Sequence, residues 1–353
     1  MERDLIMDIF DELYNKRNET EPLSFSTCKS LTNNKLASYL EKLPPQEITR
    51  IIKNLTLTFF SENINDKINF IANNIDNTIE TFTNLMNLTH YDFVLELINS
   101  NGILAYKPKY LGFVRLFFLY GFCFPITNNN NKYIVMPTDV VDKFKALPEM
   151  TIYIIEQNTL ITKYVRGLIN LFGIIEVTDI LNYVNRFMKR PVDYNTVISL
   201  IHFDSIANLY IIKYKEYFVS FFILNRVSEY IKKRRAISQY YKYTDEEINS
   251  ASDPYYLACD TLTKHQITNI FNIPKPEAEQ LMRNLTFALK EDIHFSLLTT
   301  VLKSINRDNL DQKIACILNI NENVPKWSLK GHKYSDTKKQ NPLTMKKLLE
   351  LII

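Results

Sequence analysis

The motif that decides the fold is a seven-residue segment that occurs twice, as LINSNGI at 97–103 and as LINLFGI at 168–174. Each copy ends an amphipathic helical pattern with a glycine, Gly102 or Gly173. Glycine is the preferred residue where a helix ends in the left-handed backbone region. Because the copies stand 71 residues apart and share this pattern, the sequence predicts an internal repeat.

The residues after the first copy predict a helix and then a β-hairpin. An apolar helix is expected over Tyr110–Tyr120, and two strands are expected over 121–126 and 132–136. The strands flank 127–131, whose asparagines tolerate positive φ in a turn. A further helix over 140–147 closes this unit.

The residues after the second copy predict the same order. Helices are expected over 179–187 and 194–203, and strands over 207–213 and 217–222. A closing helix is expected over 224–240. Helices followed by a hairpin, twice in one chain, are typical of tandem winged-helix-like units.

The chain is predicted to be mainly α and multi-domain, with two winged-helix-like units that each carry a small β-hairpin. Its 353 residues exceed the usual size of one domain. The expected domains are an acidic helical amino-terminal domain, two winged-helix-like units and a helical carboxy-terminal domain with a basic tail, at 1–89, 90–150, 151–242 and 243–353. A short helix is expected over Met345–Ile353.

Composition argues against several classes of enzyme. Only 6 residues are glycine, and the chain contains neither a phosphate-cradling loop motif, a dinucleotide fingerprint nor a nucleophile elbow. The five histidines stand apart, and the four cysteines lack the short spacing of a zinc site. We therefore predict a non-enzymatic protein with no catalytic residue, no metal and no cofactor.

Charge is distributed unevenly, although the net charge is only +3. Residues 1–101 hold 9 basic and 15 acidic side chains, whereas 186–235 hold 10 basic and 4 acidic ones. This asymmetry indicates either a negatively charged partner or an ordinary solvated basic surface. The predicted nucleic-acid-binding residues are Lys189, Arg190, Lys213, Lys215, Lys232, Lys233, Arg234 and Arg235. Lys213 and Lys215 fall near the tip of the second hairpin.

The helices of the two repeats that would contact bases differ in whether their side chains suit nucleic acid. The first repeat's helix over Tyr110–Tyr120 is apolar on nearly every side, so it should be buried and suits contact with protein. In the second repeat, Asn195, Thr196 and Ser199 carry groups that hydrogen-bond to bases, although neighbouring Asp193 repels phosphate. Nucleic-acid binding and protein interaction therefore stay open with equal weight.

Four segments resemble a group of uncharacterised proteins of low-GC Gram-positive bacteria: Ser30–Ile52, Gly121–Leu147, the phrase from Tyr243 to Pro254, and Pro325–His332. The resemblance implies an amino-terminal segment similar to the SAP or Rho amino-terminal fold, and an origin in a bacterium or mobile element. Members often end in a SEC-C zinc knuckle. The Cys-rich end of that knuckle is missing here, so zinc binding does not carry over.

The expected location is the cytoplasm, since the acidic start Met1–Asp4 lacks signal-peptide character and no apolar run reaches 18 residues. No membrane partner is predicted, and the sequence leaves the oligomeric state open. Trp327, the single tryptophan, is expected to anchor the tail onto the body. The leading hypothesis is a nucleic-acid-associated adaptor of DNA-binding or regulatory type. The alternative is a protein-interaction or scaffold module of a bacterial or mobile-element complex.

Overall fold

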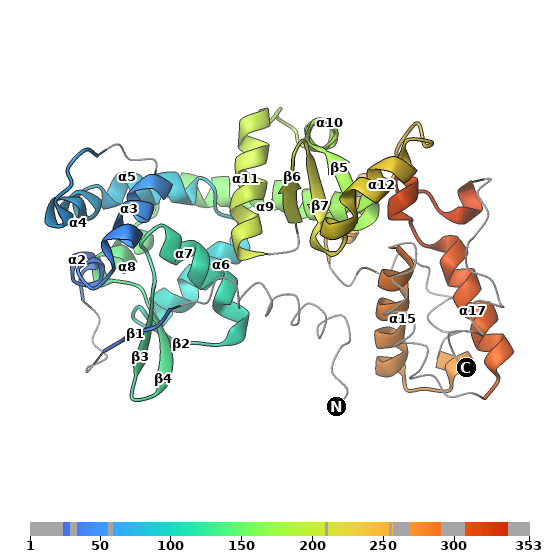
Figure 1. Cartoon of the computed structure of the whole chain (residues 1–353), viewed down its shortest axis with the longest axis horizontal. Helices are drawn as coiled ribbons and strands as arrows, with labels where there is room; N and C mark the ends of the chain where they lie inside the picture. Colours follow the sequence, from blue (N-terminus) through green and yellow to red (C-terminus); the bar gives the residue numbers. More distant parts are fainter. Residues whose placement is uncertain are drawn as a thin grey trace. The chain divides into compact units, whose positions relative to one another are not determined.

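The computed structural model describes residues 24–28, 34–55, 59–208, 211–253, 256, 268–290 and 308–337. The chain divides into two compact units. The amino-terminal unit holds the described residues of Lys16–Thr162 and Asp193–Leu209, and the carboxy-terminal unit holds those of Lys163–Val192 and Tyr210–Ile353. The prediction of a mainly α, multi-domain protein with small β-hairpins is confirmed (Figure 1). The helix expected over Met345–Ile353 lies outside the described residues, and the four-domain division stays a prediction.

The amino-terminal unit combines helices with a four-stranded sheet whose hairpin extends away from them (Figure 1). Its helices are α2 (Leu36–Leu40), α3 (Pro45–Asn54), α4 (Ile64–Asn73), α5 (Ile75–Thr83), α6 (Leu88–Asn99), η1 (Pro108–Tyr110), α7 (Leu111–Leu119), α8 (Thr138–Lys145), the first part of α9 (Glu149–Phe172), and α11 (Tyr194–Ala207). Its strands are β1 (Ser26–Thr27), β2 (Ile103–Ala105), β3 (Phe124–Asn128) and β4 (Asn131–Val135), in the order β1-β3-β4-β2.

An aromatic cluster holds this unit together. The ring of Phe82 on α5 makes edge-to-face contacts with four rings at centroid distances of 4.9 Å, those of Phe117, Tyr120, Phe122 and Phe203. Such pairs stabilise beyond their buried area. The burial expected for the helix over Tyr110–Tyr120 is confirmed, because Phe117, Leu116 and Val114 on α7 are fully buried.

The carboxy-terminal unit contains the rest of α9, a three-stranded sheet and further helices. Its helices are α10 (Val177–Phe187), η2 (Phe221–Arg226), α12 (Val227–Arg234), α13 (Asp245–Ser250), α15 (Lys275–Lys290), α17 (Leu310–Asn323), η3 (Trp327–Leu329) and η4 (Tyr334–Asp336). The strands β5 (Ile174–Glu176), β6 (Ile211–Tyr214) and β7 (Tyr217–Ser220) pair in the order β5-β7-β6.

The two copies of the repeat have the same backbone role. Gly102 and Gly173 both have positive φ, 78° and 70°, as their helix-ending positions predict. The strand after each glycine pairs with the second strand of the hairpin: Ile103 lies opposite Val135, and Ile174 lies opposite Val219. In both copies the glycine carbonyl also accepts a hydrogen bond from the residue that follows the paired position on the hairpin. Met136 N donates to Gly102 at 2.8 Å, and Ser220 N donates to Gly173 at 2.7 Å. Both predicted hairpins are present.

The second repeat departs from expectation in two elements. Helix α11 belongs to the amino-terminal unit, where it crosses α7 so closely that a Cβ on Gly112 would stand 2.0 Å from the Ala207 carbonyl oxygen. Only glycine permits this approach. The closing helix expected over 224–240 is instead the 3₁₀ turn η2 followed by α12, which ends at Arg234. The basic tract therefore lies at a helix end.

The tail is anchored by Trp327, as predicted. Its side chain is fully buried, and its indole N–H donates to the Asn170 carbonyl at 2.9 Å. Its ring lies against Gly173, where a Cβ would stand 2.4 Å from the indole Cγ. The preceding side chain, Lys326, is also buried and donates to the Leu289 carbonyl at the end of α15 at 2.7 Å. Lysine at this position satisfies a carbonyl that the helix leaves open.

Candidate functional site

All eight predicted nucleic-acid-binding residues lie in the carboxy-terminal unit. Lys189 and Arg190 follow α10, and Lys213 lies on β6. Lys215 occupies the hairpin turn with φ of 55°, and its ammonium lies 5.7 Å from the centre of the Tyr214 ring. The remaining four form the end of α12, from Lys232 to Arg235.

Six of the eight are exposed cations that make no ion pair with any residue the structure describes. They are Lys189, Arg190, Lys213, Lys215, Lys232 and Arg235. Their charges are thus available to an external anion, although exposure of this kind is also common on ordinary protein surfaces.

Lys233 differs from these six residues because a carboxylate of the protein already neutralises its charge. Its ammonium lies 2.8 Å from Glu229, one helical turn earlier on α12. The same carboxylate receives two hydrogen bonds from Arg226, at 2.9 and 3.1 Å. Hydrogen bonds from Arg226 and then Lys233 lower the pKa of Glu229 to about 2. Glu229 is therefore ionised at neutral pH and holds both cations.

Arg234 is buried, whereas the other seven predicted residues are exposed. The Arg234 side chain is only 5% exposed, because it is the residue of the basic tract that turns toward the core. Its Nη1 donates to the Ile174 carbonyl on β5, at the edge of the sheet. Four consecutive helical residues point in four directions, so one of them was bound to face inward. Burial lowers the pKa of Arg234.

The exposed cations are spread around the small sheet rather than gathered at one point. The start of α10 touches the hairpin turn, where Val177 N donates to the Glu216 carbonyl at 2.9 Å. Lys189 and Arg190 lie beyond the other end of this 11-residue helix, roughly 16 Å further along its axis. Lys213 lies on the edge strand β6, about 10 Å across the sheet from β5, beside which α12 ends. Such spacing suits contacts with an extended polyanion.

The residues proposed to read bases belong to a different unit from the predicted phosphate-binding residues. Asp193, Asn195, Thr196 and Ser199 are exposed, but they lie at the start of α11, in the amino-terminal unit. Asp193 caps this helix by accepting from the backbone N–H groups of Asn195 and Thr196, at 2.9 and 3.0 Å. The Thr196 hydroxyl donates to the same carboxylate. Two of the four side chains are therefore engaged in helix capping.

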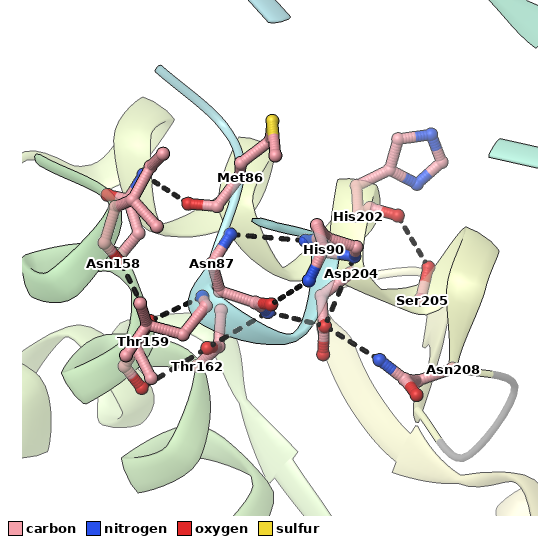
Figure 2. A network of polar contacts seen from close by, with 12 residues as sticks. Met86, Asn87, His90, Asn158, Thr159, Thr162, His202, Asp204, Ser205 and Asn208 are labelled. Carbon is pink, nitrogen blue, oxygen red and sulfur yellow. Dashed lines mark hydrogen bonds and ion pairs between the residues drawn. The ribbon is translucent and has the colours of Figure 1, made fainter. Parts of the chain in front are cut away.

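A second polar cluster, buried in the amino-terminal unit, joins α6, α9 and α11 (Figure 2). The Asn87 side chain caps α6 and donates to Asp204 on α11 at 2.8 Å. Asp204 also accepts from Asn208 at 2.9 Å. The hydroxyl of Thr159 on α9 accepts from the Leu88 backbone N–H at 2.8 Å. Asn87 and Asp204 are nearly inaccessible, with exposures of 1% and 3%.

His90 completes this cluster as a fully buried ring. Its Nδ1 accepts from the Asn87 backbone N–H at 3.1 Å, so the neutral ring carries its proton on Nε2. Nε2 faces Asp204 at 3.9 Å, and the ring is fully buried. Both nitrogens thus face protein groups, and neither faces a surface that a substrate could reach. Figure 2 shows that the exposed His202 ring points away from the cluster.

Comparisons with known proteins add no functional assignment: no family model, curated protein or solved structure matches the chain. Within the described residues, no group of three or more His, Cys, Asp or Glu side chains is placed to hold a metal ion. Among the helices that the structure describes, none combines the length and apolar character needed to cross a membrane.

Sequence reasoning missed the buried cluster because its members are distant in sequence. The spacing of Asn87 and His90 is that of a capping pair, and this local signal was readable. Asp204 stands 117 residues from Asn87, and nothing in the local pattern links them.

Proposed function

We propose that the chain is a non-enzymatic, nucleic-acid-associated adaptor whose carboxy-terminal unit contacts the phosphate backbone. The supporting observation is a set of six exposed cations around its three-stranded sheet, none of which is ion-paired with a described residue. Phosphates recur along a strand every few ångströms, so spread cations match a backbone better than a compact ligand. We also propose that the two repeats are winged-helix-like units and that the hairpin β6–β7 acts as the wing.

Charge reversal tests this proposal directly. The variants Lys213→Glu/Lys215→Glu and Lys232→Glu/Arg235→Glu should each weaken binding by about ten- to a hundred-fold, because each removes two phosphate contacts and adds repulsion. The slope of log affinity against log salt should fall by about one for each lost contact. Fluorescence anisotropy with a labelled duplex and a labelled single strand, each measured over a salt series, gives both quantities.

A matched control carries the same charge change elsewhere. Lys53→Glu/Lys107→Glu alters two exposed lysines of the amino-terminal unit and should leave affinity and slope unchanged. Binding that does not depend on salt, or an equal loss in the control, would remove the nucleic-acid proposal.

Removing the carboxylate of Glu229 should strengthen binding. Glu229→Gln removes the ion pairs that this carboxylate makes with Arg226 and Lys233, so affinity for the same single strand should rise about two- to three-fold at low salt. The control Glu246→Gln removes an exposed carboxylate on α13 that makes no ion pair with a described residue. An equal gain in both variants would show that overall charge, and not release of the two cations, determines affinity.

The alternative proposal is a protein-interaction module, and an apolar stripe on α9 favours it. Met150, Tyr153 and Leu160 lie on one face of the helix and are 67%, 48% and 42% exposed. If this surface carries the function, a defined protein should copurify after nuclease treatment. Serine at all three positions should abolish that copurification, whereas Lys213→Glu/Lys215→Glu should retain it.

A further inference from the structure

Two cations of the carboxy-terminal unit converge on one tyrosine ring. The guanidinium carbon of Arg234 lies 5.2 Å from the centre of the Tyr240 ring, and the Lys330 ammonium lies 5.1 Å from the same centre. Lys330 belongs to the tail, and its backbone has a left-handed φ of 52°. The tail is held beside residues 239–243 by backbone contacts, because Tyr241 N donates to the Lys330 carbonyl at 3.0 Å.

Two donors of Arg234 are unpaired within the described residues. Nη1 donates to the Ile174 carbonyl, whereas Nε and Nη2 are buried and find no hydrogen-bond partner among these residues. The Tyr240 hydroxyl lies close enough to favour the charged guanidinium, but it does not meet hydrogen-bond geometry with either nitrogen. Buried guanidinium donors are nearly always paired, so two unpaired ones point to an acceptor outside the described residues.

The neighbouring carboxylates do not supply that acceptor. Asp179 and Glu176 are the acids whose charges act on Arg234 or Lys330, yet neither makes an ion pair with these cations within the described structure. Burial, and then the positive charge of Arg234, lower the pKa of Lys330. The fold therefore keeps the two cations close to each other despite their mutual repulsion. An anion bound between them would offset that repulsion.

We propose that Arg234 and Lys330 form a binding site for a phosphate group. Nε and Nη2 of Arg234 and Nζ of Lys330 offer three donors, which match a tetrahedral oxyanion better than a single planar carboxylate. The Tyr240 ring lies against the guanidinium and forms one wall of the site. This site goes beyond the proposed backbone contacts, because it requires one phosphate and not a polynucleotide.

Calorimetric titration of the full chain with inorganic phosphate, against sodium chloride at matched ionic strength, tests the site. Phosphate should bind saturably to the wild type. Lys330→Asn keeps a residue that tolerates left-handed φ but removes the charge, and it should weaken binding about ten-fold. Lys242→Asn removes an exposed lysine between Tyr241 and Tyr243 and should change nothing. Absence of saturable binding, or an equal loss in both variants, would overturn the proposal.

Further variants strengthen the test. Arg234→Met should abolish binding. If it fails to fold, Asp179→Asn decides instead: removing a carboxylate whose charge acts on both cations should tighten phosphate binding, and weaker binding would contradict the site. Lys213→Glu/Lys215→Glu should leave inorganic phosphate binding unchanged, which separates this site from the proposed nucleic-acid surface. Titration with a nucleoside monophosphate and with a short single strand then distinguishes a free phosphomonoester from a strand phosphodiester.

Discussion

Replacing Gly173 with alanine is expected to lower the free energy of unfolding of the carboxy-terminal unit by roughly 2–5 kcal/mol. Positive φ costs a side-chain-bearing residue about 1–2 kcal/mol, and forcing an atom into a packed core costs about 1–3 kcal/mol more. At Gly173 both apply, because φ is 70° and the new Cβ would stand 2.4 Å from the Trp327 indole. Such a loss is a large part of the stability of an ordinary domain. Urea unfolding followed by circular dichroism measures it.

Gly121→Ala is the matched control for this variant. Its φ of 77° is equally unfavourable for alanine, but the nearest atom is the Ile51 methyl Cγ2 at 3.1 Å, which needs to shift by only a few tenths of an ångström. The expected loss is about 1–2 kcal/mol. If both variants lose the same free energy of unfolding, the clash with Trp327 does not contribute to the destabilisation of Gly173→Ala. Adding Trp327→Leu to Gly173→Ala should cost less than the sum of the two single losses, because the leucine relieves the clash.

Replacing Asp204 with alanine is expected to destabilise the amino-terminal unit by about 3–5 kcal/mol. The change removes the acceptor for the amides of Asn87 and Asn208 and the charge facing His90, all within the same buried cluster. Buried donors that lose their acceptor keep the full cost of leaving water. Urea unfolding again gives the value, and hydrogen exchange at the backbone N–H groups of α6 and α11 should accelerate.

Ser205→Ala changes the neighbouring residue on α11 and serves as the control. Among the described residues, the Ser205 hydroxyl donates only to the His202 carbonyl of its own helix. The free energy of unfolding should therefore fall by no more than about 0.5 kcal/mol. An Asp204→Ala effect as small as this would show that the buried cluster is not needed for folding.

The repeat could be predicted because its signals are local. A glycine that ends a helix, an asparagine-rich turn and alternating strands each occupy a few consecutive residues, and their backbone consequences follow directly. Gly102, Gly173 and the turn residues Asn129 and Asn130 all have the positive φ that the sequence predicted. The mainly α class followed from the same patterns.

The rest of the structure depends on contacts between distant residues. Helical periodicity located α11 but could not show that it packs on α7, an arrangement that depends on the bare backbone of Gly112. A run of four cations likewise does not reveal which one faces inward. Arg234 turns toward the core because the Ile174 carbonyl and the Tyr240 ring lie there, and both depend on tertiary folding.

The position of Trp327 makes the two units optically distinguishable. Since the chain has a single tryptophan and it is buried in the carboxy-terminal unit, selective excitation of the indole reports the environment of that unit only. Its emission should shift to longer wavelength when that unit opens and exposes the ring to water. Far-ultraviolet ellipticity, in contrast, arises from helices of both units, so two denaturation curves that fail to coincide would show that the units melt independently.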